Sequence, residues 1–198
     1  HFLKENDCSD DEILEIFDRA AHLKQNRKQR LGLANDLAGQ TWGLLFYKNS
    51  TRTRVSFEVG INELGGNALV LDQQSTQIGR GESIHDTAKV LSRYLDGLVI
   101  RTYGHEIIEE FAAHANIPVV NALTNLLHPC PIYADCFSIA EKLGESRDPF
   151  ASLTGRKLAF LGDTSCNMAN SWIMAAKLFG LKVSLAGPQD FAPKPDLL

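Results

Sequence analysis

A run of hydroxyl and guanidinium side chains near residue 50 has the residue types of an anion-binding site. Its sequence is Ser50-Thr51-Arg52-Thr53-Arg54. The apolar residues 41–47 before it are typical of a buried strand, and residues 54–64 after it follow a helical pattern. Where a strand gives way to a helix, hydroxyls, a guanidinium and free backbone N–H groups can converge at the positive end of the helix dipole. The run therefore predicts a phosphate site.

Two other interpretations of this run follow from the residues alone. Ser and Thr are ordinary helix caps, so the run is also compatible with a polar N-cap followed by solvated arginines. A nucleotide site is disfavoured, because the run contains neither a glycine-rich P-loop with its lysine nor a GxGxxG turn. The rest of the sequence is needed to choose between a cap and a phosphate site.

Two later side chains, Arg101 and His128, also have types suited to chemistry. Arg101 ends the apolar run 97–101, and His128 directly precedes Pro129. Taken alone, an arginine at a strand end is more often a salt-bridged surface residue, and a lone histidine is more often structural. Cys130 follows His128 closely and invites a Cys/His nucleophile interpretation, but catalytic pairs usually meet in space rather than in sequence.

The cysteine spacing gives no support for a disulfide framework or a zinc site. The four cysteines lack any paired CxxC spacing; they are Cys8, Cys130, Cys136 and Cys166. Such scattered thiols are typical of reduced cysteines with structural or incidental roles.

The elements that must position these residues alternate along the chain. Strand patterns occupy residues 41–47, 68–71, 97–101 and 118–121, and helical patterns occupy residues 10–23, 54–64, 84–94, 106–115 and 132–143. This alternation predicts the α/β class, with a parallel sheet covered by helices in an α/β/α domain.

A second unit begins late in the chain. Residues 144–155 are polar and contain Pro149, which indicates a linker. Strand, helix and strand patterns then follow at residues 157–161, 168–179 and 182–185. We expect one domain over residues 1–145 and the start of a second, Rossmann-like α/β domain over residues 146–198. A complete second sheet needs more strands, so we expect a fragment of a longer protein.

Composition narrows the class of partner. The 198 residues are 44% hydrophobic and 22% charged, which is ordinary globular composition. A net charge of −4 and a pI near 5.9 argue against a broad basic surface, so nucleic acid is not an expected partner. No run approaches the roughly 18 apolar residues that span a bilayer. We expect a cytoplasmic protein without membrane contact.

Beyond these patterns, one long block carries a family resemblance. Residues 46–58, read as Phe-Tyr-Lys-Asn-Ser-Thr-Arg-Thr-Arg-Val-Ser-Phe-Glu, closely resemble the phosphate-binding signature of the aspartate and ornithine carbamoyltransferases. Further blocks match in order, and they are residues 77–83, 86–88, 101–102, 128–129 and 162–163. The resemblance covers nearly the whole chain, and it favours the phosphate site over the simple cap.

The resemblance implies a role for each candidate residue. It places Ser50, Thr51, Arg52 and Thr53 on the phosphate of carbamoyl phosphate. It implies that Arg101 and His128 lie near the carbamoyl carbonyl, where with Arg52 they form the catalytic set. Preorganised donors at that position stabilise the negative charge that develops on the oxygen. It further implies a homotrimer, or a multiple of trimers, in which Gln77 on the loop of residues 72–83 reaches a neighbour's site.

The resemblance also implies the acceptor. Asn167 matches the asparagine that contacts the α-carboxylate of ornithine, and Arg80 stands where aspartate enzymes carry lysine. The implied reaction transfers the carbamoyl group to the δ-amine of ornithine, giving citrulline and phosphate without a metal or other cofactor. Asn167 is also compatible with a plain helix N-cap. Aspartate, putrescine and acylated ornithine stay open as acceptors.

One departure from the family pattern affects the carbamoyl group. The family has glutamine two residues after the proline of its His-Pro motif, whereas this chain has Pro131. Proline offers neither a side-chain acceptor nor a backbone N–H. Carbamoyl-phosphate binding is then expected to be weaker or to use carbonyl groups or water, and a non-catalytic carbamoyl-phosphate-binding paralogue is the alternative function.

Overall fold

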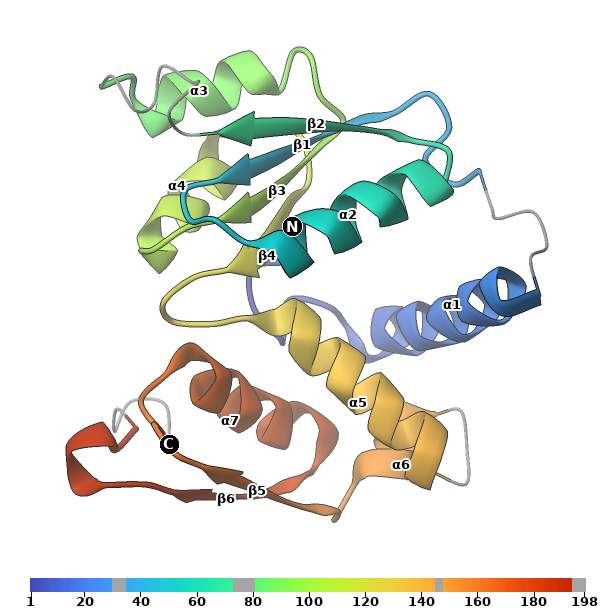
Figure 1. Ribbon diagram of the computed structural model, residues 1–198, viewed down its shortest axis with the longest axis vertical. Coiled ribbons are helices and arrows are strands. Elements are labelled where there is room, and N and C mark those ends of the chain that lie inside the picture. Colours follow the sequence, from blue (N-terminus) through green and yellow to red (C-terminus); the bar gives the residue numbers. More distant parts are fainter. Residues whose placement is uncertain (30–34, 73–80, 145–147, 194–198) are drawn as a thin grey trace. The chain divides into compact units, whose positions relative to one another are not determined.

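The computed structural model describes residues 1–29, 35–72, 81–144 and 148–193, which form two compact units (Figure 1). The first unit comprises His1–Leu3 and Leu23–Thr124, and the second comprises Lys4–His22 and Asn125–Leu198. Within the described residues, none of the helices has both the length and the apolar character that crossing a membrane requires.

The first unit is built on a four-stranded parallel sheet, as the alternation of patterns predicted. Its strands are β1 (Thr41–Phe46), β2 (Asn67–Asp72), β3 (Gly97–Arg101) and β4 (Val119–Leu123), in the order β2-β1-β3-β4. At the carboxyl edge, Phe46 is level with Asp72 on one side and with Arg101 on the other. Arg101 is in turn level with Leu123 of β4. The loops that follow these strands therefore start along one edge.

Helices cover both faces of this sheet. Successive residues of a strand point to opposite faces, so Leu44 and Leu45 enter different cores. Leu44 packs in a cluster with Ile61 of α2 (Thr51–Glu63). Leu45 packs with Ala88 of α3 (Ile84–Leu91) and with Ile108 and Phe111 of α4 (His105–His114). The chain leaves β1 toward β2 on one side, and β3 lies on the other, so the strand order reverses at β1. Ligands of open α/β sheets bind outside the carboxyl ends of strands at such a point.

Among the residues that the structure describes, the second unit combines four α-helices with a two-stranded sheet. Its helices are α1 (Asp10–Gln29, whose last turns join the first unit), α5 (Pro129–Leu143), α6 (Pro149–Leu153) and α7 (Asn167–Phe179). The parallel pair β5 (Lys157–Leu161) and β6 (Lys182–Ala186) follows the predicted pattern, and the short 3-10 helix η3 (Gln189–Phe191) comes after it. An aromatic cluster joins the helices, with Phe17 at 5.8 Å from Phe137 and 6.0 Å from Phe179 between ring centres.

The polar segment predicted as a linker contains helix α6. Asp148 caps this helix, because its Oδ1 accepts from Phe150 N at 2.8 Å and from Ala151 N at 3.3 Å. Pro149 fits the first turn, where its missing N–H needs no partner. The predicted division of roles between residues 1–145 and 146–198 stays a prediction, since the compact units divide the chain at different points.

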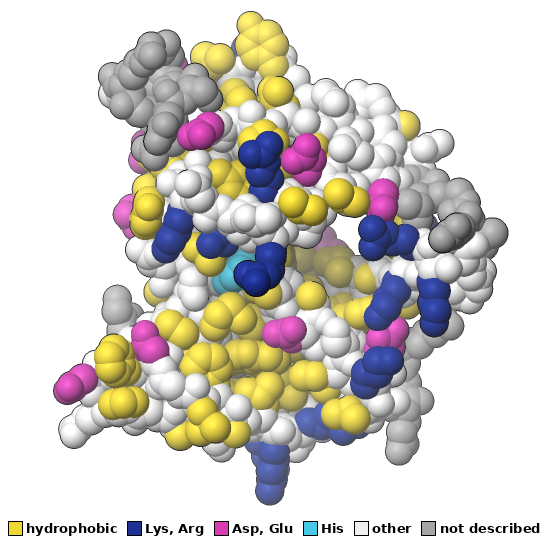
Figure 2. Space-filling view, viewed as in Figure 1, with side chains coloured by type: hydrophobic (Ala, Val, Ile, Leu, Met, Phe, Trp, Pro, Cys, Tyr) yellow, Lys and Arg dark blue, Asp and Glu magenta, His cyan; other side chains and the backbone are white. Residues whose placement is uncertain are grey.

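Charges of both signs occur on the face of the molecule drawn in Figure 2. On the face drawn in Figure 2, Lys and Arg side chains are interspersed with Asp and Glu. This distribution agrees with the small net charge of −4.

Candidate functional site

Ser50 caps helix α2 at the carboxyl edge of the first sheet. Its backbone is extended, with φ −156° and ψ 117°, and its Oγ accepts from Thr53 N at 3.3 Å. The helix begins at Thr51, three residues before the predicted start, because this cap stabilises the first turn. The N–H groups of Thr51 and Arg52 precede the first intrahelical bonds of the helix. The cap is therefore formed, and it leaves donors at the positive end of the helix.

Arg101 lies beside this helix start. Its Nη1 donates to Thr53 Oγ1 at 3.3 Å, although the two residues are 48 positions apart. Its Nε is buried and has no hydrogen-bond partner within the described chain. The structure therefore argues against the interpretation of Arg101 as a salt-bridged surface residue. Burial lowers the pKa of Arg101, but a guanidinium stays charged at neutral pH. A buried donor without an acceptor fits an anionic or carbonyl ligand.

Arg52 and Arg54 differ in their surroundings. Both side chains are exposed, but Arg54 Nε lies 3.4 Å from Glu58 Oε2, one turn further along the helix. Arg54 also lines a cleft of about 470 Å³ together with Asn49, Ser50 and Asp72. Of these two arginines, Arg52 is therefore the one whose guanidinium is better suited to bind an anion.

Two side chains at this edge were not predicted as site residues. Lys48 follows β1 and Tyr103 follows β3, and Lys48 Nζ lies 5.1 Å from the centre of the Tyr103 ring. A cation over a ring face is held by the quadrupole of the ring. Lys48 lies within the signature block, which is the sequence signal for it. The contact with Tyr103 depends on the pairing of β1 with β3.

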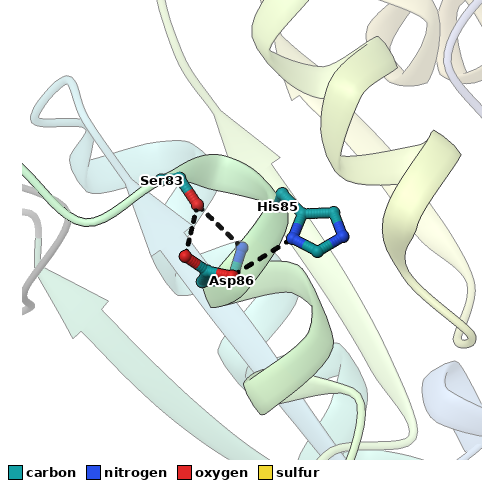
Figure 3. Close-up of polar contacts among 3 residues, drawn as sticks. All are labelled: Ser83, His85 and Asp86. Carbon is teal, nitrogen blue, oxygen red and sulfur yellow. Dashed lines mark hydrogen bonds and ion pairs between the residues drawn. The ribbon is translucent and has the colours of Figure 1, made fainter.

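Helix α3 is anchored directly after residues 73–80. Ser83 Oγ accepts from Asp86 N at 3.1 Å and donates to Asp86 Oδ2 at 2.7 Å, while His85 Nδ1 lies 3.1 Å from Asp86 Oδ1 (Figure 3). These contacts hold the pKa of the Asp86 carboxyl below its usual value. The predicted contact residue Gln77 and its neighbour Arg80 lie outside the described residues.

His128 occupies the N-cap position of α5 in the second unit. Its backbone N donates to Ser171 Oγ of α7 at 2.8 Å. Asn170, also on α7, donates from Nδ2 to Leu126 O at 3.0 Å. Two consecutive residues of α7 therefore hold the backbone that carries His128. Pro131 lies in the first turn of α5, where an absent N–H breaks no helical hydrogen bond.

Asn167 is the first residue of α7 rather than its cap. Cys166 holds the N-cap position, so the interpretation of Asn167 as an N-cap is wrong. The loop before it is fixed by Asp163, whose Oδ1 accepts from Ser165 N at 2.9 Å and from Ser165 Oγ at 2.6 Å. These bonds lower the pKa of Asp163. Asn167 is thus at the start of a helix whose preceding turn is ordered by local bonds.

The chemistry of Cys130 argues against a nucleophile. Desolvation, with a smaller contribution from the nearby Glu5 carboxyl, raises the pKa of the Cys130 thiol to about 12. The thiolate is the nucleophilic form, and it is scarce at neutral pH for such a group. The Cys/His nucleophile interpretation is therefore not supported.

The predicted site residues thus fall into separate groups. The first unit brings Ser50, Thr53 and Arg101 together, with Thr51 and Arg52 in the same helical turn. His128 and Asn167 belong to the second unit and start two of its helices, α5 at Pro129 and α7 at Asn167.

Known proteins resemble both units in sequence and in fold. The family model described as aspartate/ornithine carbamoyltransferase, carbamoyl-P binding domain, matches residues 1–141, and that of the Asp/Orn binding domain matches residues 154–198. The ornithine carbamoyltransferase of Pelobacter propionicus is 47% identical over 193 residues, which are 98% of this chain and 60% of that protein. That of Syntrophus aciditrophicus is 49% identical over 183 residues, 92% of this chain and 58% of that protein.

Solved structures of ornithine carbamoyltransferases also resemble this chain in fold. The ornithine carbamoyltransferase of Burkholderia thailandensis superposes with a TM-score of 0.90 at 37% identity, covering 100% of this chain and 65% of that one. The enzyme of Pyrococcus furiosus gives 0.90 at 39% identity, with 99% and 60% covered. The chain thus spans about 60% of the length of the curated relatives it matches. On the match of residues 1–141, the chain belongs to the aspartate/ornithine carbamoyltransferase family.

Proposed function

We propose that the full-length protein is an ornithine carbamoyltransferase, which transfers the carbamoyl group of carbamoyl phosphate to the δ-amine of ornithine. The observation that carries the proposal is the contact of Arg101 Nη1 with Thr53 Oγ1 beside the Ser50-capped helix. It gathers a guanidinium, a hydroxyl and helix N–H groups at one place, as an anionic carbonyl compound requires. The names of the relatives supply the acceptor, ornithine.

In the proposed reaction, the uncharged δ-amine attacks the carbamoyl carbon. The bond from this carbon to the bridging oxygen breaks, and phosphate leaves. The departing phosphate takes up the proton that the amine loses, so that citrulline and hydrogen phosphate are the products. Arg52, Thr53, Arg101 and His128 donate to the carbonyl oxygen as it gains charge, and orientation of the two substrates supplies much of the remaining rate. Ser50 and Thr51 join Arg52 and Thr53 on the phosphate. No covalent enzyme intermediate, metal or other cofactor is part of this mechanism.

The division of roles follows the two family models. We propose that residues 1–145 bind carbamoyl phosphate and that residues 146–198 begin the ornithine-binding half, with Asn167 on the α-carboxylate. The descriptions of the models, carbamoyl-P binding and Asp/Orn binding, support this division. A neutral amide suits a substrate that carries both a carboxylate and an ammonium, whereas a second carboxylate favours a cation.

Pro131 favours the alternative of a carbamoyl-phosphate-binding paralogue without turnover. Carbonyl groups or water have to accept from the carbamoyl NH2 group in place of a glutamine side chain. A lost hydrogen bond of this kind costs about 0.5–1.5 kcal/mol, which lowers affinity without abolishing it. We therefore propose an enzyme with turnover, and product formation distinguishes it from the paralogue.

Arg52→Ala tests the phosphate site. We expect it to weaken carbamoyl-phosphate binding about 10- to 100-fold, because a hydrogen bond to a charged group contributes about 1.5–3 kcal/mol. Isothermal titration calorimetry on the full-length protein measures the change. Arg27→Ala is the matched control, since it removes an exposed arginine paired with Glu63 at 2.9 Å, at the other end of α2. Equal affinity in Arg52→Ala and the native protein would refute the assignment.

The assembly is proposed to be a homotrimer, or a multiple of trimers, in which Gln77 completes the site of a neighbour. The resemblance carries this proposal. Mixing inactive Arg52→Ala and Gln77→Ala proteins should restore part of the activity, because some hybrid sites then combine two intact contributions. The assay is turnover after verified subunit exchange, and two Arg52→Ala preparations mixed together serve as control. Absence of any recovery would count against shared sites.

The thiols are expected to be dispensable. Cys130→Ala and Cys166→Ala should each keep turnover within about twofold of the native protein, because the proposed mechanism uses no thiol. For Cys130, a pKa of about 12 keeps the thiol protonated at neutral pH. An alkylammonium titrates near pKa ~10.4, so the rate should rise with pH through the neutral range in every variant. A pH–rate series measures both effects. A trapped carbamoyl-cysteine would show the covalent route instead.

We also propose a cytoplasmic location. The four cysteines form no disulfide among the described residues, which is typical of a reducing compartment.

A further inference from the structure

Two histidine rings meet where helices α3 and α4 pack together in the first unit. The rings of His85 on α3 and His114 on α4 lie 4.6 Å apart between their centres, at an interplanar angle of 75°. His85 is exposed and His114 is half-buried, so ions in solution can reach the pair. Neither ring belongs to the proposed carbamoyl-transfer site. Two imidazoles at this separation can act on one ligand together.

The backbone that carries the two rings is held by other contacts. Ala88 of α3 packs in one hydrophobic cluster with Ile108 and Phe111 of α4. Where the two helices end, Asn116 N donates to Ser92 Oγ at 3.0 Å. These contacts fix α3 against α4. The histidine rings are therefore kept near each other without depending on their own contact.

Asp86 orients the ring of His85. Nδ1 of His85 lies 3.1 Å from Asp86 Oδ1, while Ser83 Oγ donates to Asp86 Oδ2 at 2.7 Å (Figure 3). A carboxylate only accepts hydrogen bonds, so Nδ1 of His85 carries the proton and Nε2 has the free lone pair. Figure 3 shows Nε2 on the side of the ring away from Asp86. Histidines that bind metal ions typically donate their other N–H to a carboxylate in this way.

The separation of the rings fits a shared metal ion. When one ion binds two imidazole nitrogens at about 2.0–2.1 Å each, the ring centres lie roughly 4.5 Å apart for an angle near 90° and roughly 5.2 Å apart for a tetrahedral angle. The observed 4.6 Å agrees with the smaller angle. The interplanar angle is no obstacle, because each metal–nitrogen bond has to lie only in the plane of its own ring. Square-planar and tetragonal nitrogen sites of this kind are typical of Ni²⁺ and Cu²⁺.

We propose that His85 and His114 form a binding site for a divalent transition-metal ion such as Ni²⁺, with Asp86 as the positioning residue of His85. Among the described residues, no three side chains of the usual ligand types form a group, so the pair supplies two ligands and water supplies the others. The ion ties the first turn of α3 to the last turn of α4. It takes no part in carbamoyl transfer, and the site does not depend on the proposed function.

The first test is isothermal titration calorimetry of Ni²⁺ into the tag-free, full-length protein. His85→Gln and His114→Gln should each weaken binding at least about 10-fold, because the second nitrogen binds the ion intramolecularly. Asp86→Asn should weaken it about 10- to 100-fold, as expected for a carboxylate behind a metal-binding histidine. His22→Gln, which removes an exposed histidine of α1, is the matched control and should leave the affinity unchanged. Equal affinity in the native protein and in either variant of the pair would overturn the proposal.

The second test identifies the ring nitrogens by NMR of 15N-histidine-labelled protein at pH 8, where an ordinary imidazole is neutral. Without metal, His85 should carry its proton on Nδ1, and Asp86→Asn should shift it toward Nε2. Ni²⁺ below one equivalent should broaden the ring signals of His85 and His114 in parallel and leave that of His22 sharp. In His85→Gln, the His114 signal should persist at the same Ni²⁺ concentration. Broadening of one ring of the pair alone, or equal broadening of His22, would show an adventitious ion only and would contradict the shared site.

Discussion

Arg101→Met should lower the turnover of the full-length protein about 100- to 1000-fold. Removing one preorganised donor from a site where a carbonyl oxygen gains charge costs about that much in kcat. Arg101 lies beside Thr53, and its Nε is a buried donor without a partner in the described chain. Methionine keeps an unbranched apolar stem, so the packing of the strand end is preserved better than by alanine. Steady-state kinetics and carbamoyl-phosphate calorimetry separate the loss in kcat from the loss in affinity.

Arg27→Met is the matched control for this experiment. It removes the same group from an exposed ion pair with Glu63, and an exposed pair contributes only about 0–1 kcal/mol. Its kcat should stay close to that of the native protein. A loss of less than threefold in Arg101→Met, with folding verified, would show that Arg101 is not part of the catalytic set.

Glu5→Gln should make the protein more stable at pH 8 by about 3 kcal/mol while changing little at pH 4.5. Burial raises the pKa of Glu5 from 4.5 to about 7, so the folded state favours the neutral form. The stability supplied by that form is fully present below pH 4.5 and is lost as the pH rises to about 7. A shift of this size corresponds to about 3 kcal/mol at 1.36 kcal/mol per pKa unit. Glutamine keeps the shape and cannot ionise.

Urea unfolding at a fixed protein concentration, repeated at pH 4.5, 6, 7 and 8, measures this difference. Asp11→Asn on the exposed face of α1 is the control. It keeps Glu5, so its difference in stability from the native protein should change little with pH. Equal pH dependence in the native protein and in Glu5→Gln would mean that the Glu5 carboxyl does not titrate within the fold.

Local patterns predicted the parallel sheet well. The strand patterns at residues 41–47 and 97–101 became β1 and β3 almost unchanged, because apolar runs between polar turns leave few alternatives. Helix starts were less accurate. The helix predicted from residue 132 begins at Pro129. The first turn of a helix accepts proline, because an N–H group at that position would have no partner within the helix.

Contacts between distant parts of the chain were beyond the sequence patterns. The Arg101–Thr53 bond joins the end of β3 to the first turn of α2 only because β3 pairs with β1, and nothing local in either residue encodes that pairing. Glu5 lies in a charged N-terminal stretch that looks solvated in the sequence, yet it is buried by packing near Tyr133, 128 residues later. The resemblance supplied roles for Arg101 and His128, but it gave no indication of the buried carboxyl.

Carbamoyl transfer from 13C-labelled carbamoyl phosphate tests the central claim most directly. The full-length protein is incubated with ornithine, aspartate, putrescine or N-acetylornithine in parallel, and the products are identified by NMR and mass spectrometry. We expect labelled citrulline from ornithine at a rate well above that of the other acceptors, and loss of this product in Arg101→Met. Faster labelling of another acceptor, or carbamoyl-phosphate binding without transfer to any of them, would contradict it.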